Sequence, residues 1–149
     1  MSFVEMKQNN NIRPEGTPCL LIHGFDAEQI IIIKGLAMTL DIIDVRVVET
    51  SMQDNCIQDI IDNNIKRNAM VKPISEQVII FNDLSEHDIH KFIGDYKKTG
   101  ISRPIYAAGT PTSRTWTFKA WLEELMEERA AIAEQQKLQA MMKDGDAAN

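Results

Sequence analysis

The 149-residue sequence has only two cysteines, three histidines and 6% aromatic residues, and it has no basic run longer than the pair Lys97-Lys98. Both cysteines, Cys19 and Cys56, stand inside apolar patterns, which argues against a disulfide framework and a cysteine metal cluster. Because a nucleic-acid footprint needs clustered Lys and Arg, the formal net charge of −6 argues against nucleic acid as a partner. No apolar run approaches the length of a membrane span, and the stretch 1–18 contains no signal-peptide core. We therefore expect no membrane partner and a cytoplasmic location.

Sequence motifs of several catalytic classes are also missing. The run Leu20-Leu-Ile-His-Gly-Phe25 resembles the strand and His-Gly turn of α/β-hydrolases, but no serine has a G-x-S-x-G frame and the last histidine is His90. No G-K-[ST] motif is present, which excludes a P-loop. His87 and His90 share a helical face, yet no third ligand has suitable spacing. We expect surface histidines, no metal site, no cofactor and no catalytic residues.

The fractions of hydrophobic and charged residues are typical of a globular domain. Hydrophobic residues make up 44% and charged residues 26% of a chain long enough to bury a core. The stretch 1–17 lacks periodicity, and we expect a flexible leader there. We expect a single α/β domain at 18–134, then a helical extension and a disordered end at 135–149.

Short apolar runs alternate with helical patterns along the predicted domain. The helix starts carry capping signals: Asp26 with Gln29 three residues later forms a capping box, and Ser51, Ser85 and Thr115 are further N-cap candidates. The apolar runs that predict strands are 19–23, 42–48, 78–81 and 101–108. The order strand, helix, strand, helix therefore occurs twice.

An offset of 59 residues sets Phe25 against Leu84 and aligns the two halves of the pattern. We interpret the chain as a duplicated β-α-β-α unit, with repeats at about 18–68 and 76–134 that complete one core. Since β-α-β connections make parallel neighbours, we expect one four-stranded, mainly parallel sheet with flanking helices and an extended C-terminal helix. A flavodoxin-like order with all strands parallel and a pseudo-two-fold order with antiparallel halves both remain open.

The turn Gly109-Thr-Pro-Thr-Ser-Arg-Thr115 is the best candidate for a ligand site. Hydroxyl groups, one guanidinium and backbone N–H groups at a helix start together favour an anion. In a parallel sheet the turn would lie beyond a strand's carboxyl end, near His23, Glu49 and Asn82-Asp83. The alternative is that these residues only cap the helix. The predicted ligand-binding residues are Thr110, Thr112, Ser113, Arg114, Thr115, Trp116 and His23.

Both tryptophans lie in the segment that follows this turn. Phe118, Trp121, Leu122, Leu125 and Met126 form one stripe at helical spacing, which predicts a core-facing helix rather than a binding surface. Trp116 lies off that stripe.

Three short motifs stand out in the second half of the chain: Thr110-Pro-Thr112, Trp116-Thr-Phe118 and Leu122-Glu-Glu-Leu125. Through these motifs, the stretch from about Gln77 to Arg129 resembles the uncharacterised bacterial domain-of-unknown-function family 3783. Ser113 and Arg129 depart from the family's pattern, in which asparagine and histidine are usual. The resemblance implies a bacterial source and supplies no activity.

Two hypotheses for function follow from these observations. The run Ile30–Ile33 cannot turn wholly toward one core, and the C-terminal helix has few apolar residues of its own. We therefore expect a non-enzymatic binding or self-association domain that forms a homodimer. The alternative is a module for a small anionic ligand such as a phosphate-containing metabolite, with or without enzymatic activity, that uses the Thr110–Thr115 turn.

Overall fold

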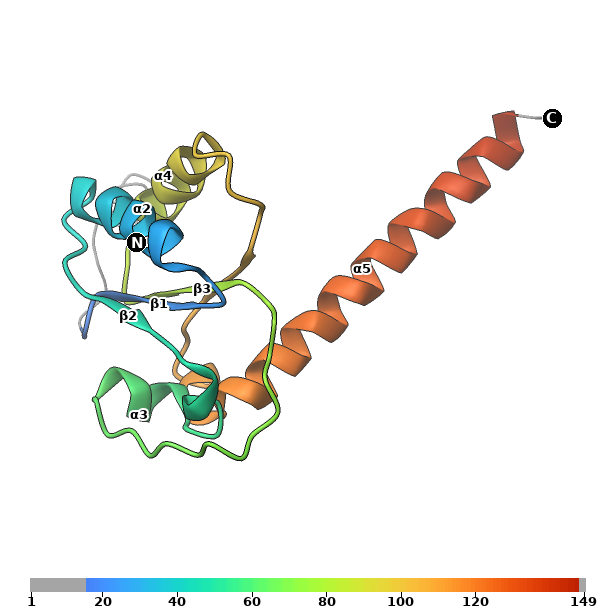
Figure 1. Cartoon of the computed structure of the whole chain (residues 1–149). Helices are drawn as coiled ribbons and strands as arrows, with labels where there is room; N and C mark the ends of the chain where they lie inside the picture. The colour runs from blue at the N-terminus through green and yellow to red at the C-terminus, as the bar shows by residue number, and fades with distance from the viewer. Residues whose placement is uncertain (1–15, 148–149) are drawn as a thin grey trace, which may run out of the picture.

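The computed structural model describes residues 16–147 as a mixed α/β domain with a long C-terminal helix (Figure 1). Residues 1–15 of the predicted leader and the last two residues of the predicted disordered end lie outside the described residues. The elements in chain order are β1 (Cys19–His23), α2 (Ala27–Thr39), β2 (Val45–Val47), the 3-10 turn η1 (Thr50–Met52), α3 (Ile57–Ile61), β3 (Val78–Asn82), α4 (Glu86–Lys97), β4 (Ile105–Ala108), the 3-10 turn η2 (Ser113–Thr115) and α5 (Phe118–Ala147).

The four strands form one mixed sheet in the order β2-β1-β3-β4. β1 pairs with β2 in parallel, and β3 pairs with β4 in parallel, as expected for strands joined through a helix. The two central strands are antiparallel, with Cys19 opposite Asn82 and His23 opposite Val78. The prediction of a mainly parallel sheet is therefore wrong at its centre, because the connection from α3 to β3 brings the chain back in the opposite direction.

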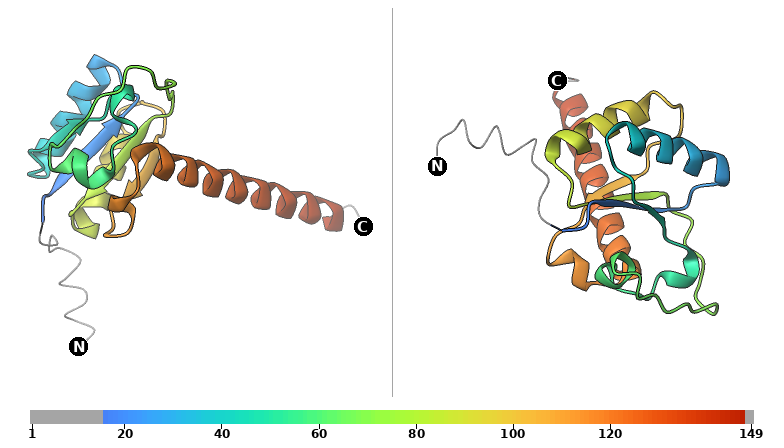
Figure 2. Two further views of the ribbon diagram at one scale, coloured as in Figure 1. Left: turned by 90° about the horizontal axis from the view of Figure 1, so that it is seen from below. Right: turned by 90° about the vertical axis from the view of Figure 1, so that its left-hand side faces the viewer.

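Helices cover both faces of this sheet, so the domain has three layers (Figures 1 and 2). α2 and α4 lie side by side on one face, where Ile33 and Phe92 pack against Ile22 and Ile79. On the other face α3 and the first turns of α5 bury Ile57, Ile60, Phe118 and Leu122 against residues such as Leu21 and Ile80. Residues that alternate along β1 and β3 thus pack into opposite cores, which explains why both strands are buried throughout and are apolar up to their last residues, His23 and Asn82.

The helix starts on the α2 and α4 face follow the predicted caps. The Asp26 side chain accepts the Gln29 N–H at 2.8 Å, and the Gln29 side chain accepts the Asp26 N–H at 3.0 Å, which completes the capping box. Ser85 Oγ accepts the Asp88 N–H at 3.1 Å. Two of the predicted caps are confirmed because they depend only on neighbouring residues.

The starts of α3 and α5 differ from the prediction. Ser51 lies inside η1, and α3 begins at Ile57, because the Asn55 amide donates to the carbonyls of Met52 and Lys66 and turns the chain first. Thr115 lies in η2, where its hydroxyl donates to the Thr112 carbonyl at 2.7 Å. Thr117 Oγ1 accepts the Ala120 N–H at 3.1 Å and caps α5 instead.

Two strands are shorter than their apolar runs. The run 101–108 yields only β4, because Pro104 has no N–H to donate and the first backbone bond to β3 comes from Ile105, whose N–H donates to the Gln77 carbonyl at 2.8 Å. The run 42–48 yields β2, flanked by Ile42, which is buried under α2, and Ile43, which is 90% exposed. Apolar composition alone does not separate a strand from the loop that leads into it.

α5 packs against the body only through its first turns. Phe118, Trp121 and Leu122 are buried and Leu125 is half-buried, whereas Met126 of the predicted stripe is 39% exposed. Every described side chain from 126 to 142 is exposed, and the helix projects away from the sheet (Figures 1 and 2). No helix among residues 16–147 is both long and apolar enough to cross a membrane.

The two cysteines offer a test of the core. Cys19 is fully buried, and this burial raises the pKa of its thiol to about 11, whereas Cys56 is half-buried beside the start of α3. Because the thiolate is the reactive form, we predict that a maleimide labels Cys56 in the folded chain near neutral pH and labels Cys19 only in denaturant. Mass spectrometry of labelled peptides, with Cys56→Ser as the control, measures both rates. Labelling of Cys19 in the folded chain at the rate of Cys56 would contradict the buried position.

Candidate functional site

The predicted Thr110–Thr115 turn is closed by hydrogen bonds between its own residues. The Thr110 N–H donates to Ser113 Oγ at 2.8 Å, and the Ser113 N–H donates to Thr110 Oγ1 at 3.1 Å. The N–H groups of Arg114 and Thr115 donate to the carbonyls of Thr110 and Thr112. Four of the turn's N–H groups are therefore engaged inside the turn, which favours the capping interpretation over a preformed anion cradle.

Arg114 forms an ion pair with a buried carboxylate. Its Nη2 lies 3.4 Å from Asp83 Oδ1, and the Asp83 side chain is only 5% exposed. Asp83 Oδ2 also accepts the Thr17 N–H at 2.9 Å. The positive charge of the turn thus already has a counter-charge within the chain, and an external anion would compete with Asp83 for it.

Asn82 connects the same cluster to the start of β1. Its Nδ2 donates to the Thr17 carbonyl at 2.8 Å and to Asp83 Oδ2 at 3.2 Å. Its Oδ1 is buried and has no hydrogen-bond partner in the described part of the chain. We call Thr17, Asn82, Asp83 and Arg114 the strand-end cluster, because their contacts join the residue before Pro18 and β1 to the end of β3.

Gly16 lies against the Asp83 side chain of this cluster, and this contact was not predicted. Its φ is 143°, and a Cβ there would lie 2.1 Å from Asp83 Oδ2, so no side chain fits. Thr17 and Gly16 lie in the stretch interpreted as a leader. In the sequence, the pair Gly16-Thr17 only precedes the apolar run of β1. Its position there does not predict the contact with Asp83, which is 66 residues away from Thr17.

His23 lies at the other end of the sheet from this cluster. His23 pairs with Val78 at the beginning of β3, whereas Asn82 at the end of β3 pairs with Cys19. Glu49 follows β2 at the His23 end, because β2 runs parallel to β1. The grouping of His23 and Glu49 with the turn therefore fails, since it assumed that all strands end at one edge.

His23 itself is a core residue. It is 3% exposed, its Nδ1 lies 2.8 Å from the Glu76 carbonyl oxygen, and its ring packs on Phe118 at a centroid distance of 5.2 Å. Gly24 follows with φ 90°, and a Cβ there would lie 2.4 Å from the same carbonyl oxygen. The His-Gly pair thus turns the chain tightly into α2 and presents no open catalytic face.

The backbone around Trp116 joins the turn to α3. The Trp116 carbonyl accepts the Ile57 N–H at 3.0 Å, and Thr117 forms an antiparallel bridge with Cys56. The Trp116 side chain is 39% exposed. Trp116 is accessible for contacts, but its backbone role is structural.

The remaining histidines are exposed, as predicted, at positions 87 and 90 on α4. Among the described residues no group of three or more His, Cys, Asp or Glu side chains could hold a metal ion.

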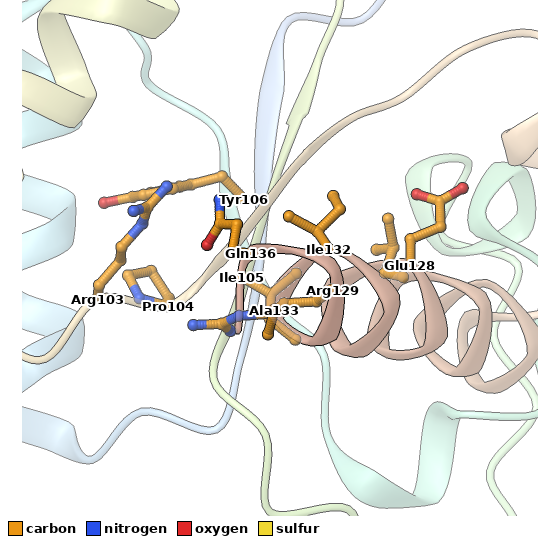
Figure 3. A pocket seen from close by; sticks show the side chains of 10 residues that line it. Arg103, Pro104, Ile105, Tyr106, Glu128, Arg129, Ile132, Ala133 and Gln136 are labelled. Atoms are coloured by element: carbon orange, nitrogen blue, oxygen red, sulfur yellow. The ribbon is translucent and has the colours of Figure 1, made fainter. Parts of the chain in front are cut away.

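A groove of about 480 Å³ lies between the start of β4 and the exposed part of α5 (Figure 3). Its apolar lining includes Ile105, Leu125 and Ile132, and its charged lining includes Arg103, Glu128 and Arg129. Tyr106 also lines it; its Oη is buried with no hydrogen-bond partner among the described residues. Burial raises the pKa of Tyr106, and nearby Arg103 opposes that shift. No sequence signal indicated this groove, because it depends on the angle at which α5 leaves the sheet.

Comparison with known proteins bears on the second half of the chain. Residues 77–132 match the family described as Domain of unknown function (DUF3783). The match confirms the predicted resemblance and spans β3, α4, β4 and the part of α5 up to Ile132. It contains most of the groove and, of the strand-end cluster, Asn82, Asp83 and Arg114. No curated protein and no solved structure matches the chain.

The strand-end cluster makes a prediction about stability. Replacing Arg114 by Ala leaves the nearly buried Asp83 carboxylate without its cation, so we expect the free energy of unfolding to fall by about 1–2 kcal/mol. Arg103→Ala is the matched control, because Arg103 is exposed and has no ion pair within the described residues. Urea unfolding followed by circular dichroism measures both variants. Equal losses would show that the pair with Asp83 contributes no specific stability.

Proposed function

We propose that this chain is a non-enzymatic self-association domain of the bacterial cytoplasm, active as a homodimer. The observation that carries the proposal is the projecting part of α5. Ile132 and Leu138 are 56% and 55% exposed there, and Met141 and Met142 are 63% and 71% exposed. Most of the stability of a protein helix comes from packing of its apolar face, and exposed apolar side chains gain free energy when a partner covers them.

A second apolar surface lies on α2 and supports the same reading. Ile31 and Met38 lie on one stripe of the helix and are 70% and 71% exposed, and Ile43, in the connection after α2, is 90% exposed. Gly35 lies between Ile31 and Met38 on this stripe, with no atom within 4 Å of the place a Cβ would occupy. A surface of this kind is typical of a protein contact.

The polar side chains that the sequence offers as candidate ligand-binding groups take part in structural contacts, which supports the proposal of a binding role. The polar side chains of the strand-end cluster bind one another, and His23 is buried. The exposed surfaces of α2 and α5 carry apolar side chains next to charged ones. Such faces suit association better than catalysis.

We also infer that the two halves derive from one duplicated unit. What supports this is that β1-α2-β2 and β3-α4-β4 each consist of a parallel strand pair joined by a helix on the same face of the sheet. Two halves related in this way form a pseudo-two-fold arrangement within one chain.

Self-association has a direct test. We predict that the full chain sediments at twice the mass of one chain at micromolar concentration. The double variant Ile132→Gln with Leu138→Gln should shift this equilibrium toward monomer, because it removes apolar surface while keeping good helix formers. Met70→Gln, in the connection between α3 and β3, is the matched control for the loss of an exposed apolar side chain outside both helix surfaces, because Met70 is 92% exposed. A chain that remains monomeric throughout the concentration range would overturn the proposal.

The second candidate function is binding of a small anionic ligand at Thr110–Thr115. What favours it is Arg114 in η2, whose side chain is 21% exposed and whose contact with Asp83, at 3.4 Å, is long. A ligand phosphate could exchange with the Asp83 carboxylate on the guanidinium.

A thermal-shift screen with nucleotides and phosphorylated metabolites tests this candidate. A ligand present at a hundred times its Kd should stabilise the fold by about 2.7 kcal/mol. Arg114→Ala should abolish the shift, and Arg103→Ala should leave it intact. If no compound in the screen raises the melting temperature, anion binding at Thr110–Thr115 is rejected.

A further inference from the structure

We propose that β2 is a second contact surface, at which two copies of this chain pair their β2 strands antiparallel about a two-fold axis and join their sheets. This inference rests on the proposed self-association and adds to it a contact that does not involve α5. It follows from the position of β2 in the sheet, from the alternation of residues 43–47 and from the charges of β2.

β2 is an outer strand with one unpaired side. Among the described residues it pairs only with β1. The Leu20 N–H donates to the Asp44 carbonyl at 3.0 Å, so the even-numbered positions of this stretch bond to β1. Because successive residues of a strand direct their backbone groups to opposite sides, the N–H and C=O groups of Val45 and Val47 point away from β1. Such an edge is a template for a further strand.

The other outer strand, β4, is less open. The exposed part of α5 lies beside it, and residues of both line the groove (Figure 3). Pro104, which precedes β4, also has no N–H to offer a neighbour. β2 and the exposed part of α5 therefore lie at opposite edges of the sheet, so a β2 contact and an α5 contact can form in one assembly.

The side chains of residues 43–47 alternate between the two faces of the sheet. Val45 packs against the core on the α2 face, whereas Arg46 lies on the α3 face, where its Nη1 donates to the Ile60 carbonyl at 2.9 Å. By this alternation Ile43 and Val47 share the face of Val45. They are 90% and 37% exposed, and no described strand lies outside β2 to cover them. A second β2 would cover both.

The charges of β2 select one antiparallel register. Outward-pointing backbone groups must face one another, so for strands of this length the two-fold axis passes through residue 44, 45 or 46. An axis at 44 sets Asp44 opposite Asp44 of the second copy, and an axis at 46 does the same to Arg46. Like charges directly opposite are destabilising. An axis at Val45 instead sets Asp44 of each copy opposite Arg46 of the other.

The axis at Val45 also completes the apolar contact. Val45 then faces Val45 of the second copy, and Ile43 faces Val47 beside it on the α2 face. On the α3 face, the Asp44–Arg46 ion pair, 2.9 Å within one chain, meets the same pair in the reverse order. Both faces of the junction are therefore complementary to themselves, as a two-fold contact requires.

The joined sheet has room for the helices of both copies. α2 connects β1 and β2, and α4 connects β3 and β4, and the two helices pack side by side within one chain (Figure 1). Strands are about 4.8 Å apart, so helices over neighbouring strand pairs are about 10 Å apart, an ordinary packing distance. Two α2 helices across the β2 junction have the same spacing.

Introduced cysteines test the register. In a Cys56→Ser background, Ile43→Cys and Val47→Cys are made as two separate proteins. Residues 43 and 47 of different copies are directly opposite in the proposed register, so the mixture should yield a mixed disulfide on mild oxidation. Each protein alone should give little cross-link, because its two cysteines lie about 13 Å apart along the strands. Intact-mass spectrometry distinguishes the products.

Val45→Pro tests the backbone pairing. The Val45 N–H points away from β1, so proline removes a donor only from the open edge. Val45→Thr keeps that N–H and is the matched control. Both are made in the Ile132→Gln, Leu138→Gln background, which weakens association through α5. Since β2 has only three residues, sedimentation equilibrium up to millimolar concentration is needed. We expect dimers of the background and of Val45→Thr, and monomers of Val45→Pro.

A charge exchange between copies gives a readout that damage to the fold would not produce. Asp44→Lys and Arg46→Glu are made as two separate proteins in the same background. Each alone sets like charges opposite one another, so its dimer Kd should rise about three- to tenfold. In the mixture every opposed pair has opposite charges, so a heterodimer should form with about the Kd of the background. A variant that is merely unfolded is not restored by mixing.

The outcomes separate this contact from self-association through α5. An intact chain that is monomeric up to millimolar concentration overturns both. An intact chain that dimerises while the α5 variant background stays monomeric, or a mixture in which residues 43 and 47 do not cross-link, overturns the β2 contact and leaves the α5 surface standing. The mixed disulfide, the loss of dimers in Val45→Pro and the heterodimer of the charge variants support the β2 contact.

Discussion

The antiparallel pairing of β1 with β3 determines the rest of the architecture. Five residue pairs join these two strands at the centre of the sheet, and each strand then carries a parallel neighbour on its outer side. Because the two halves run in opposite directions, the carboxyl ends of β1 and β2 lie at one end of the sheet and those of β3 and β4 at the other. The polar residues after β3 and β4 therefore meet the start of β1, and the strand-end cluster forms there.

The sequence predicted the features that depend on local chemistry. The Asp26 capping box, the Ser85 cap, β1 and β3 are present as predicted, because each is specified by a few adjacent residues or by a continuous apolar run. Strand direction could not be predicted in the same way. A strand buried on both faces has the same apolar pattern whichever way its neighbour runs, and the long connection from α3 to β3 allows either direction.

The candidate site was predicted in part for the same reason. The turn lies near Asn82 and Asp83 as proposed, since these residues follow adjacent parallel strands. His23 was misplaced because its position depends on the central pairing. Thr17 completes the cluster through a contact across 66 positions of sequence, and the groove depends on the direction of α5. Neither leaves a periodic signal in the chain.

The family match covers only one of the two strand pairs of the sheet. Residues 77–132 supply β3, α4, β4 and the first half of α5, but alone they would leave the β1-facing edge of β3 unpaired. They would also leave both faces of β3 partly uncovered, because α2 packs beside α4 and α3 packs beside the start of α5. An unpaired apolar edge strand is prone to aggregate. The first half of this chain removes that edge by pairing β1 with β3, so the centre of the sheet is closed within one chain and β2 and β4 become its outer strands.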